Sequence, residues 1–203
     1  MTRLLIAMLV AVSGTAFGLG PGAAAGAETT PTQTGGRDAA HLHYSQGVGL
    51  LSAGDLLGAR AELREALRLQ PDLVQARFSL GTALYLSGDV DSAIDAYRTV
   101  IRQQPDLAHA HLHLGIALMV THAWADAQAS LKTAVSLQPD SVTAHYDLGL
   151  VRDRLGERRE AIESYREALR LRPDHAEAHY HLGLALKQNK QEIEATKEFL
   201  AAA

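Results

Sequence analysis

The chain has 203 residues, enough for one ordinary domain with a continuous core, and its formal net charge is −4 at pH 7. It contains no cysteine, which excludes disulfide bonds, thiolate metal sites and a lipidated cysteine. Because the balance is mildly acidic and no basic stripe follows a helix face, no nucleic-acid partner is expected.

Residues 1–27 differ in composition from the rest of the chain. Arg3 gives a positive start, residues 4–12 are an unbroken apolar run, and Ala25-Gly26-Ala27 has the small residues typical of a cleavage site. The run is shorter than the ~20 residues that a membrane-spanning helix needs. We expect a secretory signal peptide cut after Ala27, which leaves a periplasmic or secreted protein without stable membrane insertion. The alternative is an uncleaved membrane anchor.

Residues 28–38 contain Thr, Gly and Pro and almost no apolar side chains. Such a composition is typical of a flexible linker. The sequence therefore predicts a folded domain over residues 39–203.

Glycine and proline recur in this domain with a constant step of 34 residues. The glycines are Gly47, Gly81, Gly115, Gly149 and Gly183, and the prolines are Pro71, Pro105, Pro139 and Pro173. Alanine keeps the same step at Ala59, Ala93, Ala127, Ala161 and Ala195. One period held over most of a chain indicates stacked helical hairpins. The units are about 40–73, 74–107, 108–141, 142–175 and 176–203.

Each unit has the helical spacing of apolar residues over two stretches of roughly 14 residues. The repeated glycine is small, which lets the two helix backbones of a unit approach closely. A glycine followed by an acidic residue closes the first helix and begins the second at Gly54-Asp55, Gly88-Asp89 and Gly156-Glu157. The third unit has His122-Ala123 there, so we expect a less well capped turn.

These repeated positions resemble the tetratricopeptide repeat, whose pattern is Leu-Gly, an aromatic residue, Ala, Phe or Tyr, Ala and Pro. The leucine before the glycine is present in four units, as Leu80, Leu114, Leu148 and Leu182. The resemblance covers about residues 40–203 and implies an all-α, right-handed α-solenoid of five 34-residue helix–turn–helix repeats, the last truncated. It departs from the family at the tryptophan position, which holds His43, Arg77, His111, His145 and His179, and at Arg152, where an aromatic residue or leucine is usual.

The resemblance also implies a concave groove lined by the first helices of successive units. The groove positions that we single out are Tyr44, Phe78, Tyr85, Leu112, Ile116, Tyr146 and Tyr180. A strip of aromatic and aliphatic side chains with few charges suits an extended apolar segment or a partner helix. The alternative is that some of these residues belong to the core between repeats, because an apolar groove and an apolar seam have the same period.

The chain has ten histidines, which raises the alternative of a metal site. His109 and His113 share a helix face, as do His175 and His179, but no local set supplies three or four ligands. We expect no metal site and no cofactor. Histidines at the tryptophan position are expected to pack between helices with a nitrogen reaching water or backbone. Another repeat position, held by His113, Asp147 and His181, lines one strip of surface.

No glycine-rich phosphate loop, nucleophile elbow or Ser/His/acid set is present, so we expect that the protein is not an enzyme. The predicted function is a noncatalytic interaction scaffold of the bacterial cell envelope that binds a protein or peptide in the groove. A metal- or small-ligand-binding periplasmic protein that uses the histidines is the alternative.

The C-terminal end carries Ile193, Phe199 and Leu200, which predict an association surface for a homodimer or a partner's helix. A frayed terminal helix is the competing interpretation.

Overall fold

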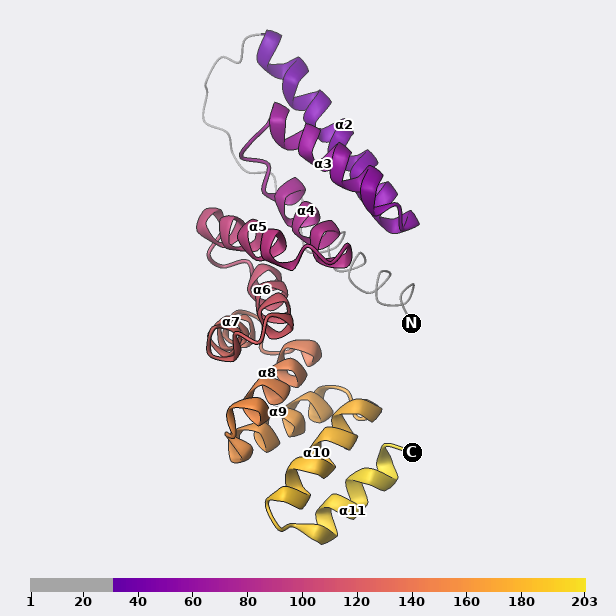
Figure 1. Ribbon diagram of the computed structural model, residues 1–203, viewed down its shortest axis with the longest axis vertical. Coiled ribbons are helices and arrows are strands. Elements are labelled where there is room, and N and C mark those ends of the chain that lie inside the picture. Colours follow the sequence, from indigo (N-terminus) through magenta and orange to yellow (C-terminus); the bar gives the residue numbers. More distant parts are fainter. Residues whose placement is uncertain (1–30) are drawn as a thin grey trace. The chain divides into compact units, whose positions relative to one another are not determined.

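The computed structural model describes residues 31–203, so the expected signal peptide lies outside the described residues. Within that range the chain forms ten α-helices and no strand (Figure 1). The helices are α2 (Pro31–Ala53), α3 (Leu56–Leu69), α4 (Val74–Leu86), α5 (Val90–Gln103), α6 (Ala108–Val120), α7 (Trp124–Leu137), α8 (Val142–Leu155), α9 (Arg158–Leu171), α10 (Ala176–Gln188) and α11 (Glu192–Ala201). The fold is the all-α repeat solenoid that the period predicts.

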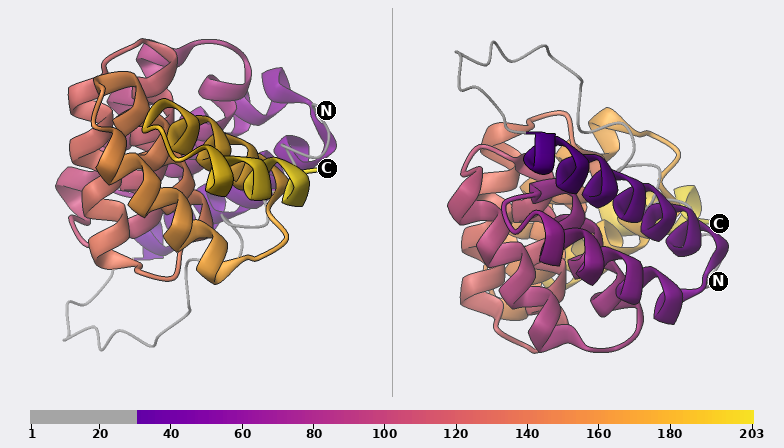
Figure 2. Two further views of the ribbon diagram at one scale, coloured as in Figure 1. Left: turned by 90° about the horizontal axis from the view of Figure 1, so that it is seen from below. Right: turned by 90° about the horizontal axis from the view of Figure 1, so that it is seen from above.

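The helices fall into two compact units. The first unit ends at Pro105 and contains α2 to α5, and the second begins at Asp106 and contains α6 to α11. Consecutive helices pack as hairpins: α2 with α3 and α4 with α5 in the first unit, then α6 with α7, α8 with α9 and α10 with α11 in the second (Figure 2). Each predicted repeat is therefore one helical hairpin.

The repeated glycines lie where the two helices of each hairpin meet. A Cβ atom on Gly115 would lie 2.6 Å from Leu131 Cγ, and one on Gly149 would lie 2.5 Å from a ring carbon of Tyr165. The same approach occurs at all five glycines, against Leu63, Tyr97, Leu131, Tyr165 and Phe199 in turn. The predicted close approach of the paired helices is confirmed, and we call these five contacts the glycine seam.

The turns inside the hairpins use a left-handed backbone residue. Gly54, Gly88 and Gly156 have φ values of 83°, 86° and 81°, and the third turn reaches the same region with His122 at φ 60°. A non-glycine residue adopts this conformation at a steric cost because of its Cβ atom. Ala123 provides no side-chain cap for α7, but Asp89 provides none for α5 and Glu157 none for α9, so the third turn differs from these two in its left-handed residue and not in its cap.

The start of α2 differs from the expected linker. The helix begins at Pro31, so residues 31–38 are helical rather than flexible. Proline suits a first helical turn because its fixed φ is helical and its missing N–H is not needed there. Among residues 35–53 of this helix, Ala40 is the first buried residue, and a Cβ atom on Gly35 or Gly36 would meet nothing within 4 Å. Residues 35–39 therefore lie before the first core residue of the hairpin.

Among the described helices, none is both long and apolar enough to cross a membrane.

Candidate functional site

The seven predicted groove residues all lie on first helices of hairpins, as expected. Tyr44 is on α2, Phe78 and Tyr85 on α4, Leu112 and Ile116 on α6, Tyr146 on α8, and Tyr180 on α10. Their exposure differs: Phe78 is 1% exposed and Leu112 9%, whereas Tyr180 is 50% exposed. Phe78 and Leu112 therefore belong to the interior, as the alternative interpretation had it. The others are partly exposed.

Five aromatic side chains gather in the second unit, and we call them the tyrosine–histidine cluster: Tyr146, Tyr165, His175, Tyr180 and His181. The ring centroid of Tyr146 is 5.0 Å from that of His175 and 5.8 Å from that of His181. His181 also stacks on Tyr165 at 6.0 Å and meets the ring of Tyr180 edge-on at 5.5 Å. His181 thus links the two tyrosines that the sequence placed in the groove row.

The repeat register explains why these residues meet. Tyr146 and Tyr180 hold the same repeat position on α8 and α10, and His181 follows Tyr180 directly. Tyr165 comes from the second helix of the hairpin, α9, and its ring passes over Gly149, where a larger residue would block it. Because Gly149 has no side chain, Tyr165 on the second helix of the hairpin can reach the cluster.

A hydrogen bond adds a carboxylate to the cluster. The Tyr165 hydroxyl donates to Asp153 Oδ2 at 2.8 Å. Burial raises the pKa of Asp153, and the hydrogen bond from Tyr165 and nearby cationic groups act in the opposite direction. Burial lowers the pKa of His181, which favours a neutral ring against the tyrosines.

Asp147 is a second carboxylate close to the cluster, and unlike Asp153 it has no hydrogen-bond partner among the described residues. The residue is only 9% exposed, and none of the described residues forms a hydrogen bond or ion pair with its side chain. Burial raises the pKa of Asp147 to about 7. Burial raises the pKa of Tyr146 and of Tyr165, and the charge of Asp147 adds to this effect at both, so Asp147 lies within electrostatic reach of both rings. A buried carboxylate without a partner is unusual, because its desolvation is uncompensated.

Side chains at the family's tryptophan position make hydrogen bonds to backbone carbonyl oxygens of the preceding turn. His145 Nε2 lies 2.8 Å from the Pro139 carbonyl oxygen, and His179 Nε2 lies 2.9 Å from that of Pro173. Arg77 makes the equivalent contact, since its guanidinium donates to the Pro71 carbonyl at 2.7 Å. The expectation of a half-buried side chain with a nitrogen on the backbone is confirmed for these positions.

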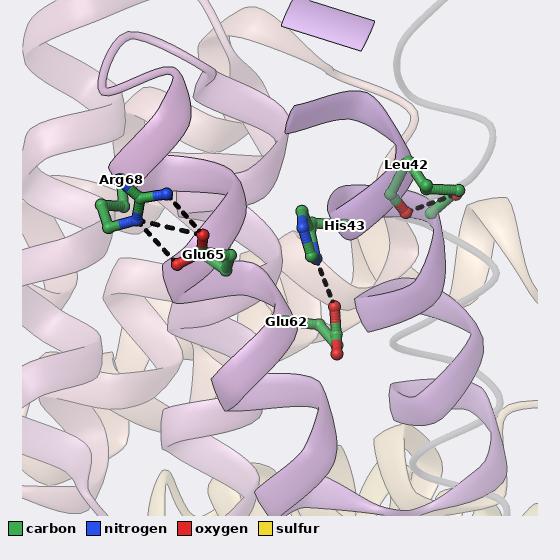
Figure 3. A network of polar contacts seen from close by, with 6 residues as sticks. Leu42, His43, Glu62, Glu65 and Arg68 are labelled. Carbon is green, nitrogen blue, oxygen red and sulfur yellow. Dashed lines mark hydrogen bonds and ion pairs between the residues drawn. The ribbon is translucent and has the colours of Figure 1, made fainter. Parts of the chain in front are cut away.

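Two histidines at this position also join the helices of their own hairpin. His43 Nδ1 is 2.6 Å from Glu62 Oε2, and His179 Nδ1 is 2.6 Å from Glu198 Oε2. Figure 3 draws the contact between His43 and Glu62. Burial alone would lower the pKa of His179, but its hydrogen bonds with Glu198 and with the Pro173 carbonyl raise it. These contacts leave the ring nitrogens of His179 engaged within the chain.

The histidine pairs considered for a metal do not form a site with other ligands. His113 Nδ1 bonds to the carbonyl oxygen of His109 at 2.8 Å, and burial lowers the pKa of His113 to about 4. His175 Nδ1 lies 3.1 Å from Glu177 Oε2. Across residues 31–203, no group of three or more His, Cys, Asp or Glu side chains is arranged to hold a metal ion.

Of the three residues predicted to form an association surface, two are exposed and one is packed within its hairpin. Ile193 and Leu200 on α11 are 78% and 74% exposed. Phe199 instead packs over Gly183 within its own hairpin, and its ring centroid lies 6.0 Å from that of Tyr180. Ile193 and Leu200 remain the exposed apolar members of the predicted set.

A cleft of about 380 Å³ lies between α7, α8 and α9, and the sequence did not indicate it. It is lined by Lys132, Val135, His145, Leu148, Arg152, Glu163, Ser164 and Glu167. The guanidinium of Arg152 crosses from α8 to α9, where it donates to the Glu160 carbonyl at 3.0 Å and to Ser164 Oγ at 2.6 Å. The only sequence signal was Arg152 itself, at a position where the family has an aromatic residue or leucine. The lining contains a lysine and an arginine together with two glutamates, so its charge favours no one class of ligand.

Family models match most of the repeat region. A model described as tetratricopeptide repeat matches residues 44–108, 87–121 and 112–157, and one described as TPR repeat matches residues 154–190. The chain belongs to the tetratricopeptide repeat family. A search of curated proteins found no significant match.

Solved structures with the same fold include several MamA proteins. One MamA crystal structure is 29% identical, with a TM-score of 0.73, and the match covers 77% of this chain and 91% of that one. MamA from Desulfovibrio magneticus RS-1, residues 41 to the end, is 25% identical with a TM-score of 0.77, over 81% of this chain and 93% of that one. YrrB, described as a TPR protein with an unusual peptide-binding site, is 21% identical with a TM-score of 0.70, over 79% and 82% of the two chains. The likeness to YrrB shows the fold alone.

Proposed function

We propose that this protein is a noncatalytic interaction scaffold of the bacterial cell envelope, and that it binds a peptide or partner helix over the tyrosine–histidine cluster of the second unit. The observation that carries the proposal is the linked pair Tyr146 and Tyr180, held in one repeat register on α8 and α10 and joined through His181. Both tyrosines keep part of their surface exposed.

The chemistry of the cluster suits recognition of a protein segment. Tyrosine presents a large, rigid apolar ring together with a hydroxyl, and buried aromatic residues commonly provide much of the binding energy at interfaces. The rings are already fixed by contacts with His175, His181 and Tyr165, so binding needs little further ordering.

Family membership supports the interaction role. Tetratricopeptide repeats stack hairpins into extended surfaces that suit binding of other chains. The description of YrrB as having a peptide-binding site provides a precedent on this fold, although not for these residues.

The proposed location follows from residues 1–27, whose basic start, apolar run and small residues have the character of a secretory signal. The mature protein should then begin at Glu28. Intact mass spectrometry of material from the periplasm or medium tests this, and a membrane-bound species that keeps Met1 would support the anchor alternative.

The binding role is tested by affinity capture from an envelope extract. The purified protein is compared with the double variant Tyr146→Ala/Tyr180→Ala, and captured proteins are identified by mass spectrometry. We expect the double variant to keep its helical circular dichroism and to lose the captured partner. Leu57→Ala is the control, because Leu57 is exposed on α3 and lies outside the cluster. Capture that is the same for wild type and the folded double variant would rule out this surface.

A further inference from the structure

Three residues of the second unit share one repeat position, and two of them have partners. His113 bonds to the His109 carbonyl, and His181 packs against Tyr146, Tyr165 and Tyr180. Asp147 holds this position on α8, and among residues 31–203 nothing donates a hydrogen bond to its carboxylate. The Asp147 carboxylate is therefore a nearly buried hydrogen-bond acceptor beside the cluster that no described residue satisfies.

The neighbouring charged groups are already engaged. The Arg154 guanidinium lies over the ring of Trp124, 5.7 Å from its centroid, and Arg158 donates to Gln188 Oε1 at 2.9 Å. The carboxylates near the cluster are also paired: Asp153 accepts from Tyr165, and Glu177 lies 3.1 Å from His175 Nδ1. Asp147 is thus the carboxylate at this surface that still lacks a donor, and the nearby cations have other contacts.

We propose that the Asp147 carboxylate recognises a cationic side chain of a bound peptide, an arginine or lysine whose charged group lies between Asp147 and the ring of Tyr146. This inference rests on the proposed peptide-binding function and names the residue class that the peptide must supply.

Two physical effects favour a cation at this place. A carboxylate that is shielded from water gains more from a charged donor than an exposed one does, and a guanidinium or ammonium group satisfies it with short, charge-assisted hydrogen bonds. The face of an aromatic ring also attracts a cation, and Asp147 lies within electrostatic reach of the Tyr146 side chain. A neutral ligand would gain neither effect.

The test uses pools of nonapeptides whose fifth position is fixed as arginine, lysine, citrulline or leucine, and whose other positions are random but contain no arginine or lysine. Citrulline has nearly the shape of arginine without its charge. Each pool is passed over the immobilised protein, and the retained amount is measured. We expect the arginine and lysine pools to be retained about tenfold more than the citrulline pool, as befits a partly buried charge pair.

The variants Asp147→Asn and Asp147→Leu should reduce this excess to less than about twofold, because they remove the charge that the cation pairs with. Asp140→Asn is the matched control, since Asp140 is an exposed acid in the preceding turn, and it should keep the full excess. Helical circular dichroism of each variant confirms that it is folded.

The outcomes separate this inference from the broader function. Equal retention of the arginine and citrulline pools, or an excess that persists in both Asp147 variants, overturns recognition of a cation by Asp147. If all pools are retained equally but lost in Tyr146→Ala/Tyr180→Ala, the peptide-binding function stands and only the cation inference fails. If no pool is retained, both fail.

Discussion

The glycine seam and the strip that contains Asp147 lie on the same hairpins but follow opposite rules. The seam is built in the same way in all five hairpins, with a glycine on the first helix packed under a Leu, Tyr or Phe side chain from the second helix. The strip, held by His113, Asp147 and His181 in the second compact unit, changes its chemistry from one hairpin to the next. The positions that must repeat for the helices to pack thus define the fold, and the position that varies between hairpins holds Asp147, where we propose recognition.

The largest expected effect comes from breaking the seam. Gly115→Leu places a side chain where Leu131 Cγ already stands 2.6 Å from a Cβ atom, so we expect a loss of about 3 kcal/mol in the free energy of unfolding. Because neighbouring repeats stabilise one another, amide exchange should also rise in α8 and α9. Urea denaturation and hydrogen exchange measure both.

Gly49→Leu is the control for this change. A Cβ atom on Gly49 meets nothing within 4 Å, and leucine favours helix over glycine by up to about 1 kcal/mol. This variant should be as stable as wild type or more so. If both variants change stability equally, the seam does not depend on close packing.

A smaller effect of opposite sign is expected at the strip. Burial raises the pKa of Asp147 from its ordinary 3.8 to about 7 in the folded state, so the folded protein binds the proton more tightly than the unfolded chain. Stability therefore falls as the pH rises from about 4 to about 7 and stays reduced above that range. Asp147→Asn removes this penalty, and we expect it to stabilise the protein by about 2 kcal/mol at pH 8.

The gain from Asp147→Asn should shrink as the pH is lowered and become small near pH 4, where the folded-state carboxyl is neutral and only about half of the unfolded chains have lost the proton. Tyr146 and Tyr165 do not contribute to this change, because burial raises the pKa of both and keeps them neutral. Thermal melts at the two pH values provide the test, with Asp140→Asn as the matched exposed control. A gain that is equal at pH 4 and pH 8 would show that the Asp147 carboxylate carries no burial penalty.

The smallest effect is expected at the third turn. His122→Gly relieves a left-handed backbone at φ 60°, but it also makes the unfolded chain more flexible and removes the ring contact with Trp124. We expect a net gain of roughly 0.5 kcal/mol. The reverse change, Gly156→His at φ 81°, should destabilise the fourth hairpin. A loss of stability in His122→Gly would mean that the ring contact outweighs the backbone strain.

The repeat period predicted the features that depend on local geometry. A glycine under a bulky residue and a turn residue with positive φ are required in each hairpin, so they recur at a fixed step and can be found by counting. Lys190, at φ 61°, was missed because the fifth turn has no glycine to indicate it. Helix formation by residues 31–38 was missed because composition alone does not show how far a helix extends beyond its packed core.

The candidate site was predicted only in part, for a physical reason. Tyr146 and Tyr180 were found from the groove row, but Phe78 and Leu112 share that row and are buried, since helical period does not distinguish a groove from a core. The reach of the Tyr165 hydroxyl to Asp153 depends on how α8 and α9 pack, which no spacing within one helix reveals. Likewise, the sequence placed Asp147 on a strip of surface, and only the structure shows that it is nearly buried and without a partner.

The most direct test of the separation between fold and recognition is peptide retention by the single variant Tyr180→Ala. Half of the Tyr180 side chain is exposed, so its loss should leave the urea midpoint almost unchanged. Retention of the arginine-centred peptide pool is measured for this variant and for wild type under conditions where both are fully folded. We predict retention at least about fivefold lower for Tyr180→Ala, in line with truncation of an aromatic contact at an interface. Retention equal to that of wild type would contradict the assignment of recognition to this surface.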